Sequence, residues 1–197
     1  MNKSLSLKDL KVEIIGGQIM SRVKAESEEQ VFETKRVMVP KAIRSDGTVD
    51  ISELPEEKLK VAADDKRVTK TGDIVIKLST PYDAALIEDE SAGCIVPSFC
   101  AIIRHCDNID KRYLLAFLNS SYCKDQLKQQ VAGALMTVLS VGKVGNVMVP
   151  FLSADEQYKI GVNYFKTQEK LKIIKQIIEL ETKRNDVIFK ELVKNYE

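Results

Sequence analysis

Residues 153–197 contain no proline and only one glycine, Gly161, so the sequence predicts a single helix over this whole segment. The segment opens with Ser153-Ala154-Asp155-Glu156, the pattern of a capping box, in which the serine and glutamate side chains each accept a hydrogen bond from the other residue's amide. Gly161 costs such a helix about 1 kcal/mol, which is too little to end it. At about 1.5 Å per residue the helix would be about 65 Å long, more than a domain of this size covers. Part of it must therefore project.

Apolar residues recur along this helix at intervals of three and four, which places them on one side of it. The main stripe consists of Ile160, Tyr164, Leu171, Ile174, Ile178, Ile188 and Leu192. The second stripe, beside it, consists of Ile173, Ile177, Leu180 and Val187. A helix this long and apolar needs a partner helix, and the chain offers no second one, so we predict a homodimer whose coiled coil uses the main stripe. The alternative is a helix that folds back on its own domain, which the length opposes for the distal half.

The preceding residues, 1–152, predict one domain of the α+β class. Short apolar runs alternate with turns, and Cys94–Arg104 carries apolar residues on both faces, as a central buried strand does. Asp110 is a candidate N-cap for a helix over 111–119, and Gly133 is a fitting residue to end a second helix over 122–132. We therefore expect an α+β domain with a mixed sheet, followed by one long coiled-coil helix over 153–197.

Composition narrows the class of protein further. The chain is 44% hydrophobic, which is enough for a core, yet it has no run of about 18 apolar residues that could span a membrane. No signal-peptide core follows Met1-Asn2-Lys3-Ser4. The cysteines, at positions 94, 100, 106 and 123, lack the C-x-x-C spacing of a metal or redox site. These features favour a cytoplasmic protein with free thiols and no membrane contact.

Two short patterns are similar to catalytic motifs of DNA-modifying enzymes but lack residues that the chemistry requires. Ser79-Thr80-Pro81-Tyr82 is similar to the N/D-P-P-Y tetrad of amino-methyltransferases, but it has no Asn or Asp to hold the target amine. No glycine-rich cofactor loop follows a strand. Glu56-Glu57-Lys58 could form part of a nuclease metal site with Asp46 or Asp50, because two carboxylates must converge on Mg²⁺. The simpler prediction for Leu54–Leu59 is a charged surface helix with Pro55 in its first turn.

A thiol–imidazole pair of Cys100 and His105 is also disfavoured. On an extended strand the two side chains point to opposite faces about 17 Å apart, so a core cysteine is the better interpretation. We therefore predict no catalytic residue, no bound metal and no cofactor.

Four short segments, in this order and spacing, carry a resemblance to a known family. Lys70–Ile76 (KTGDIVI) is similar to a GDI(L/V) strand, and Tyr113–Ser120 (YLLAFLNS) to a Y-x3-FLNS helix. Gly133–Ser140 (GALMTVLS) and Val149–Ile160 (VPFLSADEQYKI) resemble the G-x7-LS and IPxPxxxEQxxI segments that follow. Together they resemble the specificity subunit of type I restriction-modification systems over roughly residues 70–165.

The resemblance implies a target-recognition domain that reads a short DNA half-site, followed by a helix. Family members usually contain two such units in tandem, with their helices paired antiparallel. This chain has one unit, so the resemblance implies a half-size subunit of which two copies rebuild the whole. The chain also departs from the family after the GDIV strand, where Lys77–Tyr82 replaces a loop that often contains glycine.

We therefore predict a non-catalytic subunit that binds double-stranded DNA as a homodimer and directs a separate methyltransferase subunit and a translocase-nuclease (restriction) subunit. Charge is balanced in both parts, with 9 Lys and Arg against 8 Asp and Glu in residues 153–197, so any DNA-binding face must be local. Residues 34–45 and 126–154 are basic segments without an acid. The predicted DNA contacts are Lys35, Arg36, Lys41, Arg44, Lys77, Tyr82 and Lys143. The alternative function is a stand-alone coiled-coil homodimer that regulates or scaffolds on DNA without a methyltransferase.

Overall fold

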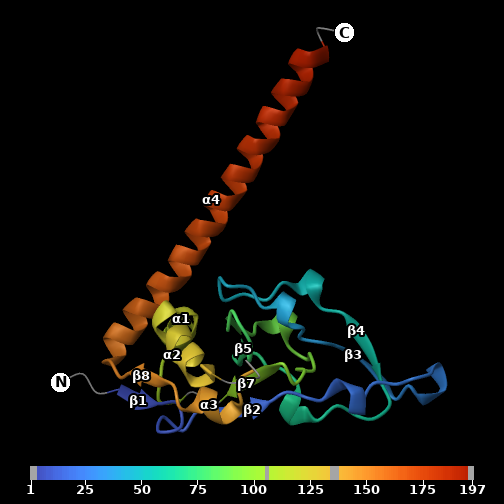
Figure 1. Ribbon diagram of the computed structural model, residues 1–197, viewed down its shortest axis with the longest axis vertical. Coiled ribbons are helices and arrows are strands. Elements are labelled where there is room, and N and C mark those ends of the chain that lie inside the picture. Colours follow the sequence, from blue (N-terminus) through green and yellow to red (C-terminus); the bar gives the residue numbers. More distant parts are fainter. Residues whose placement is uncertain (1–3, 105–106, 134–137, 195–197) are drawn as a thin grey trace.

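The computed structural model describes residues 4–104, 107–133 and 138–194. Its centre is a four-stranded antiparallel sheet in the order β2-β7-β5-β6, formed by Glu13–Gly16, Cys100–Arg104, Ile74–Lys77 and Ala84–Leu86. β1 (Ser4–Ser6) pairs with β8 (Met148–Pro150), and β3 (Glu33–Arg36) pairs with β4 (Glu56–Leu59). Figure 1 shows the β3–β4 pair in a lobe beside the central sheet. The strand ladders are all antiparallel among the described residues, and parallel pairing is confined to single bridges such as Val37 to Ile95.

Helices cover one face of the central sheet. They are α1 (Lys111–Asn119), α2 (Ser121–Val131), the short α3 (Val141–Gly145) and the first part of α4 (Ala154–Lys194). Short 3-10 helices in the connections are Met20–Arg22, Glu28–Gln30, Pro40–Ala42, Ile51–Glu53, Asp65–Arg67 and Asp89–Ser91. The α+β class is therefore confirmed, and so are the helix over 111–119 and its N-cap, where Asp110 accepts a hydrogen bond from the Tyr113 amide.

The core lies on both faces of the two central strands, as the alternating pattern predicted. Ile103 of β7 and Ile76 of β5 face the helices, whereas Ile102 and Val75 face a layer of loops that includes Met38. All of these side chains are fully buried or nearly so. The strand is shorter than expected, because Pro97 turns the chain and β7 begins only at Cys100.

The predicted surface helix at Leu54–Leu59 is wrong. Residues 56–59 form strand β4, in register with β3, and Leu59 at its end is fully buried. Local charge and the proline favoured a helix, but pairing with β3 and the burial of Leu59 decide for the strand.

The long helix is present, and its start is the predicted capping box. The Ser153 amide donates to Glu156 Oε2 at 2.9 Å, and the Glu156 amide donates to Ser153 Oγ at 3.4 Å. Through Phe165 the helix packs on the domain, and from Glu169 to Lys194 every residue is exposed. We call residues 166–194 the arm. Figure 1 shows it rising away from the domain.

Close contact with α1 holds the base of the arm. Gln157 is buried, accepts from the Asp110 amide at 2.9 Å and donates to the Leu152 carbonyl oxygen at 2.9 Å. A Cβ atom at Gly161 would lie only 2.6 Å from Arg112 Cβ, so glycine is what allows the two helices to approach. The direction of the arm is therefore fixed by packing against α1. No helix of the described residues is long and apolar enough to cross a lipid bilayer.

Candidate functional site

Several loops meet at one end of the central sheet, where β2 and β5 end and β6 and β7 begin. The Leu78 amide donates to the Phe99 carbonyl oxygen at 2.9 Å, and the Leu139 amide donates to the Leu78 carbonyl oxygen at 2.7 Å. The Ser98 amide donates to the Gln18 carbonyl oxygen at 2.8 Å. We call residues 17–19, 78–83, 97–99 and 138–143 the sheet-end cluster. Loops presented by a rigid sheet in this way are common binding sites.

A buried carboxylate ties α2 to this end of the sheet. Asp83 accepts from Lys77 Nζ at 2.9 Å and from Lys124 Nζ at 2.7 Å, and its side chain is 5% exposed. Burial opposes the charged form of Asp83, but the hydrogen bonds from Lys124 and Lys77 outweigh it, so the pKa of this carboxyl lies below its ordinary value. Two ammonium groups against one carboxylate leave one positive charge here. The electrostatic potential at this end of the sheet is therefore more positive, which favours the binding of anions.

Three of the seven predicted DNA-contacting residues lie in or beside the sheet-end cluster, and they differ in what they expose. Lys77 is mostly covered, with a side chain 12% exposed. Lys143 is half-buried and donates from Nζ to the Gln130 carbonyl oxygen at 2.8 Å. Tyr82 is only 1% exposed and packs in the core under the helices. A buried ring offers no face to DNA, so Tyr82 is withdrawn from the proposed contacts.

The other four predicted contacts, in the basic segment 34–45, lie elsewhere and already have protein partners. Lys41 forms an ion pair with Glu53, and Arg44 with Asp50. On β3, Arg36 donates to the Ala92 carbonyl oxygen at 3.1 Å, and Lys35 lies 3.7 Å from Glu33. Acids outside the segment thus pair with three of its four cations, and the segment is not an unopposed basic patch.

One exposed aromatic residue of the sheet-end cluster was missed by the sequence analysis. Phe99 is 60% exposed at the tip of a turn closed by a hydrogen bond from the Cys100 amide to the Pro97 carbonyl oxygen at 2.9 Å. The expected continuous strand over 94–104 would have buried Phe99 within the sheet. The available signal was Pro97, because proline within an apolar run argues for a break in the strand.

The main stripe of the helix divides between the domain and the arm. Leu171, Ile174, Ile178, Ile188 and Leu192 are exposed on the arm, and Ile160 is exposed near the helix start. Tyr164 instead packs against the domain core, where its hydroxyl accepts from Asn119 Nδ2 at 3.0 Å and burial raises its pKa to about 12. We therefore remove Tyr164 from the predicted dimer interface.

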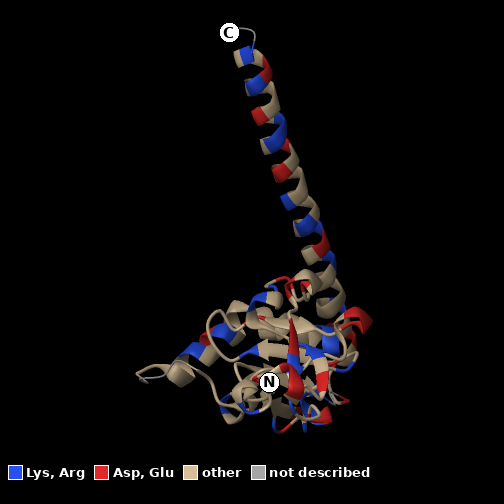
Figure 2. Ribbon diagram, turned by 90° about the vertical axis from the view of Figure 1, so that its right-hand side faces the viewer, with Lys and Arg blue, Asp and Glu red and all other residues tan. Residues whose placement is uncertain are grey.

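The arm carries both signs of charge (Figure 2), with a short basic run of Lys170, Lys172 and Lys175 followed by Glu179 and Glu181. The second stripe is as open as the main one, with Ile173, Ile177, Leu180 and Val187 all exposed. The two stripes together give the arm a wide apolar sector that the domain does not cover.

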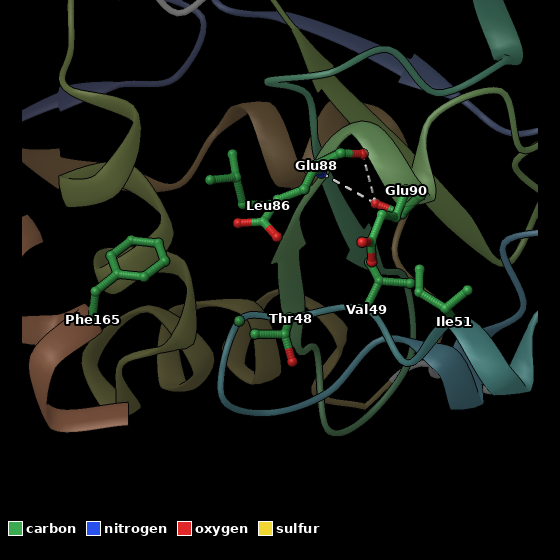
Figure 3. A pocket seen from close by; sticks show the side chains of 9 residues that line it. Thr48, Val49, Ile51, Leu86, Glu88, Glu90 and Phe165 are labelled. Carbon is green, nitrogen blue, oxygen red and sulfur yellow. Dashed lines mark hydrogen bonds between the residues drawn. The ribbon is translucent and has the colours of Figure 1, made fainter. Parts of the chain in front are cut away.

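A small hollow of about 60 Å³ lies at the base of the arm. Figure 3 shows Phe165 pointing into it from α4, opposite Glu88 and the loop that carries Thr48 and Val49. Its size suits one or two water molecules rather than a cofactor. We interpret it as a gap in the packing where the arm leaves the domain.

The residues considered for chemistry occupy structural positions. Burial raises the pKa of the Cys100 thiol to about 12, as expected of a core cysteine, and His105 lies outside the described residues. Glu57 pairs with Lys24 at 2.7 Å across the β3–β4 lobe. Within the described residues, no three His, Cys, Asp or Glu side chains are grouped so as to hold a metal ion.

We compared this architecture with protein families, curated proteins and solved structures, and only the solved structures gave matches. No protein-family model matches the chain, and neither does any curated protein. The HsdS subunit from Thermoanaerobacter tengcongensis matches 90% of the chain with a TM-score of 0.61 and 17% identity. A type I restriction-modification S subunit from M. genitalium matches 94% with a TM-score of 0.53 and 17% identity. The fold is that of a type I S subunit.

A third match is a chain from a structure of complex assembly and conformational transition in a type I R-M system. It matches 92% of this chain with a TM-score of 0.64 and 18% identity. The chain spans 47%, 43% and 44% of the lengths of these three proteins, which is about half of an S-subunit fold. The resemblance of the sequence motifs to this family is thus confirmed at the level of the fold.

Proposed function

We propose that the chain is a DNA sequence-recognition unit of a type I restriction-modification complex. The observation that carries the proposal is the S-subunit fold, shared over 90% of the chain. The domain binds DNA and the arm joins it to other subunits. Catalysis belongs to a separate methyltransferase and a separate translocase-nuclease, so this subunit works in the cytoplasm without a cofactor or metal of its own.

The sheet-end cluster is the proposed DNA-binding face. Lysine side chains position the domain by contacting phosphates, which carries no sequence information, whereas loop side chains read base edges in the major groove. The loops that meet at this end of the sheet support this face, and so does the net positive charge that Lys77 and Lys124 leave against Asp83.

Two copies pair through their arms, antiparallel, and so present two domains to one DNA molecule. The exposed main stripe supports this pairing, since a fully buried Leu or Ile contributes about 1.5–3 kcal/mol. Identical domains related by a two-fold axis read identical half-sites in inverted orientation, separated by bases that the domains do not contact. The second stripe remains open in such a pair, and we propose that it docks the methyltransferase.

The test combines DNA selection with co-purification. The purified chain should enrich an inverted repeat with an uncontacted spacer from a random DNA pool. The tagged chain, expressed in its source cells, should co-purify with a DNA methyltransferase, and deletion of its gene should remove methylation at the same motif. A motif bound without any associated methyltransferase would favour the stand-alone regulator, and failure to enrich any sequence would contradict DNA recognition altogether.

A further inference from the structure

We infer that Phe99 reads one base pair of each half-site by packing its ring against the 5-methyl group of a thymine in the major groove. The inference rests on the proposed function and adds to it a residue and the chemical group that it recognises. Phe99 is 60% exposed, whereas the core side chains around its turn, such as Leu78, are buried. An aromatic ring in that position adds nothing to the core, and it lies among the loops of the proposed DNA-binding face.

The backbone holds the Phe99 turn rigidly. The turn is closed by the Cys100 amide on the Pro97 carbonyl oxygen, and the amides of Leu78 and Gln18 donate to the carbonyl oxygens of Phe99 and Val96. Gly17 packs directly against the turn, because a Cβ atom there would lie 2.0 Å from the Pro97 carbonyl oxygen. A side chain on a fixed backbone loses less conformational entropy on binding than one on a mobile loop, which suits a specificity contact.

The positive charge beside the turn is the feature that favours DNA as the partner. Lys77, which pairs with Cys100 in the sheet next to the turn, shares Asp83 with Lys124 and leaves one positive charge at this end. Among the uncharged residues of the cluster, Ser98 and Thr80 are small and polar, whereas Ile19 and Val138 are exposed apolar residues. Apolar contact of a phenylalanine with the thymine methyl group is a recognised form of major-groove readout.

The experiment uses the full chain and the half-sites that it selects. Each thymine of the selected site is replaced in turn by uracil, which lacks only the 5-methyl group, and affinity is measured for the parent, Phe99→Ala and Phe32→Ala. Phe32 is the matched control, because it is 67% exposed but lies immediately before β3, outside the sheet-end cluster. Thermal unfolding of both variants should match the parent, since neither ring is part of the core.

We expect one thymine per half-site at which uracil weakens binding of the parent about 4-fold, or about 16-fold when both half-sites are changed. Phe99→Ala should bind the thymine site more weakly than the parent and should be indifferent to uracil at that position. Phe32→Ala should behave as the parent does.

Three results would overturn the inference while leaving DNA recognition intact. They are a selected half-site without thymine, a Phe99→Ala variant that binds as tightly as the parent, and a variant that still loses affinity with uracil at that position. Tight DNA binding by Phe99→Ala would assign the exposed ring to a protein partner instead. A parent chain that selects no sequence would remove the proposed function as well.

Discussion

Gly161 shows how a single residue sets the direction of the arm. In the sequence it looks like a weak point of the helix, because glycine is a poor helix former. In the structure it lies directly against α1, where a Cβ atom would meet Arg112 Cβ at 2.6 Å and the Tyr113 amide nitrogen at 2.9 Å. The cost in helix propensity is offset by packing.

This gives opposite expectations for alanine at two helical glycines. Gly161→Ala should destabilise the protein by about 1–3 kcal/mol, because the new methyl group meets backbone and Cβ atoms that cannot move aside. Gly142→Ala in α3 should be neutral or stabilising by up to about 1 kcal/mol, since the nearest atom is Ser140 Oγ at 3.8 Å. Urea unfolding followed by circular dichroism measures both. Stabilisation by Gly161→Ala would show that the helices can separate without cost.

At the residue scale, the sequence showed which side chains are basic or aromatic, but it did not show which groups they contact in the folded chain. It marked Arg44 and Lys41 as basic, but the folded chain brings Asp50 and Glu53 to them across a turn. It marked Tyr82 as a loop residue, but the backbone there places the ring in the core. Such pairings depend on how the chain turns back and packs, which the residue types alone do not encode.

At the scale of elements, the arm stands out because its apolar residues lack packing partners within the described part of the domain. Its apolar residues are exposed over several turns, and Ile178 is 61% exposed. Apolar surface of this extent on one helix is typical of an interface between chains.

Charges placed on the main stripe should separate the proposed dimer. Ile174→Glu together with Ile178→Glu should give a monomer by light scattering, because each substitution removes about 1.5–3 kcal/mol of apolar burial and adds a charge at the seam. The control carries the same added charge on the polar side of the helix, as Gln168→Glu with Gln176→Glu, and should remain dimeric. If the first variant kept the mass of the parent, the main stripe would not be the interface.

Helices and strands could be predicted where the local sequence pattern agrees with the way the element packs in the folded chain. The capping serine, the helix over 111–119 and the long helix all follow from periodicity and caps. β4 was not predictable, because four polar and apolar residues after a proline become a strand only when β3 lies beside them. The Phe99 turn was missed for the related reason that alternation on both sides of Pro97 concealed the break.

At the scale of the whole molecule, the proposed dimer measures a distance along DNA. Seven residues inserted next to Gln176 would keep every stripe residue on its side of the helix and lengthen the pair by about 10.5 Å. At about 3.4 Å per base pair, the spacer of the selected DNA should grow by roughly three base pairs with unchanged half-sites. Selection from a random pool, run for parent and variant, tests this. A dimeric variant with the parent's spacer would mean that the arm does not set the distance.

Because α4 is anchored where Gly161 contacts α1, a small rotation at that point moves the far end of the arm by a larger distance. The arm extends about 43 Å beyond its anchorage at about 1.5 Å per residue. A tilt of about 5° at that pivot would swing the far end by about 4 Å, which is roughly one base-pair step. Small changes in a side chain at the pivot, such as Arg112, would then alter which spacers fit. Variation at the pivot could shift target choice without touching the reading face.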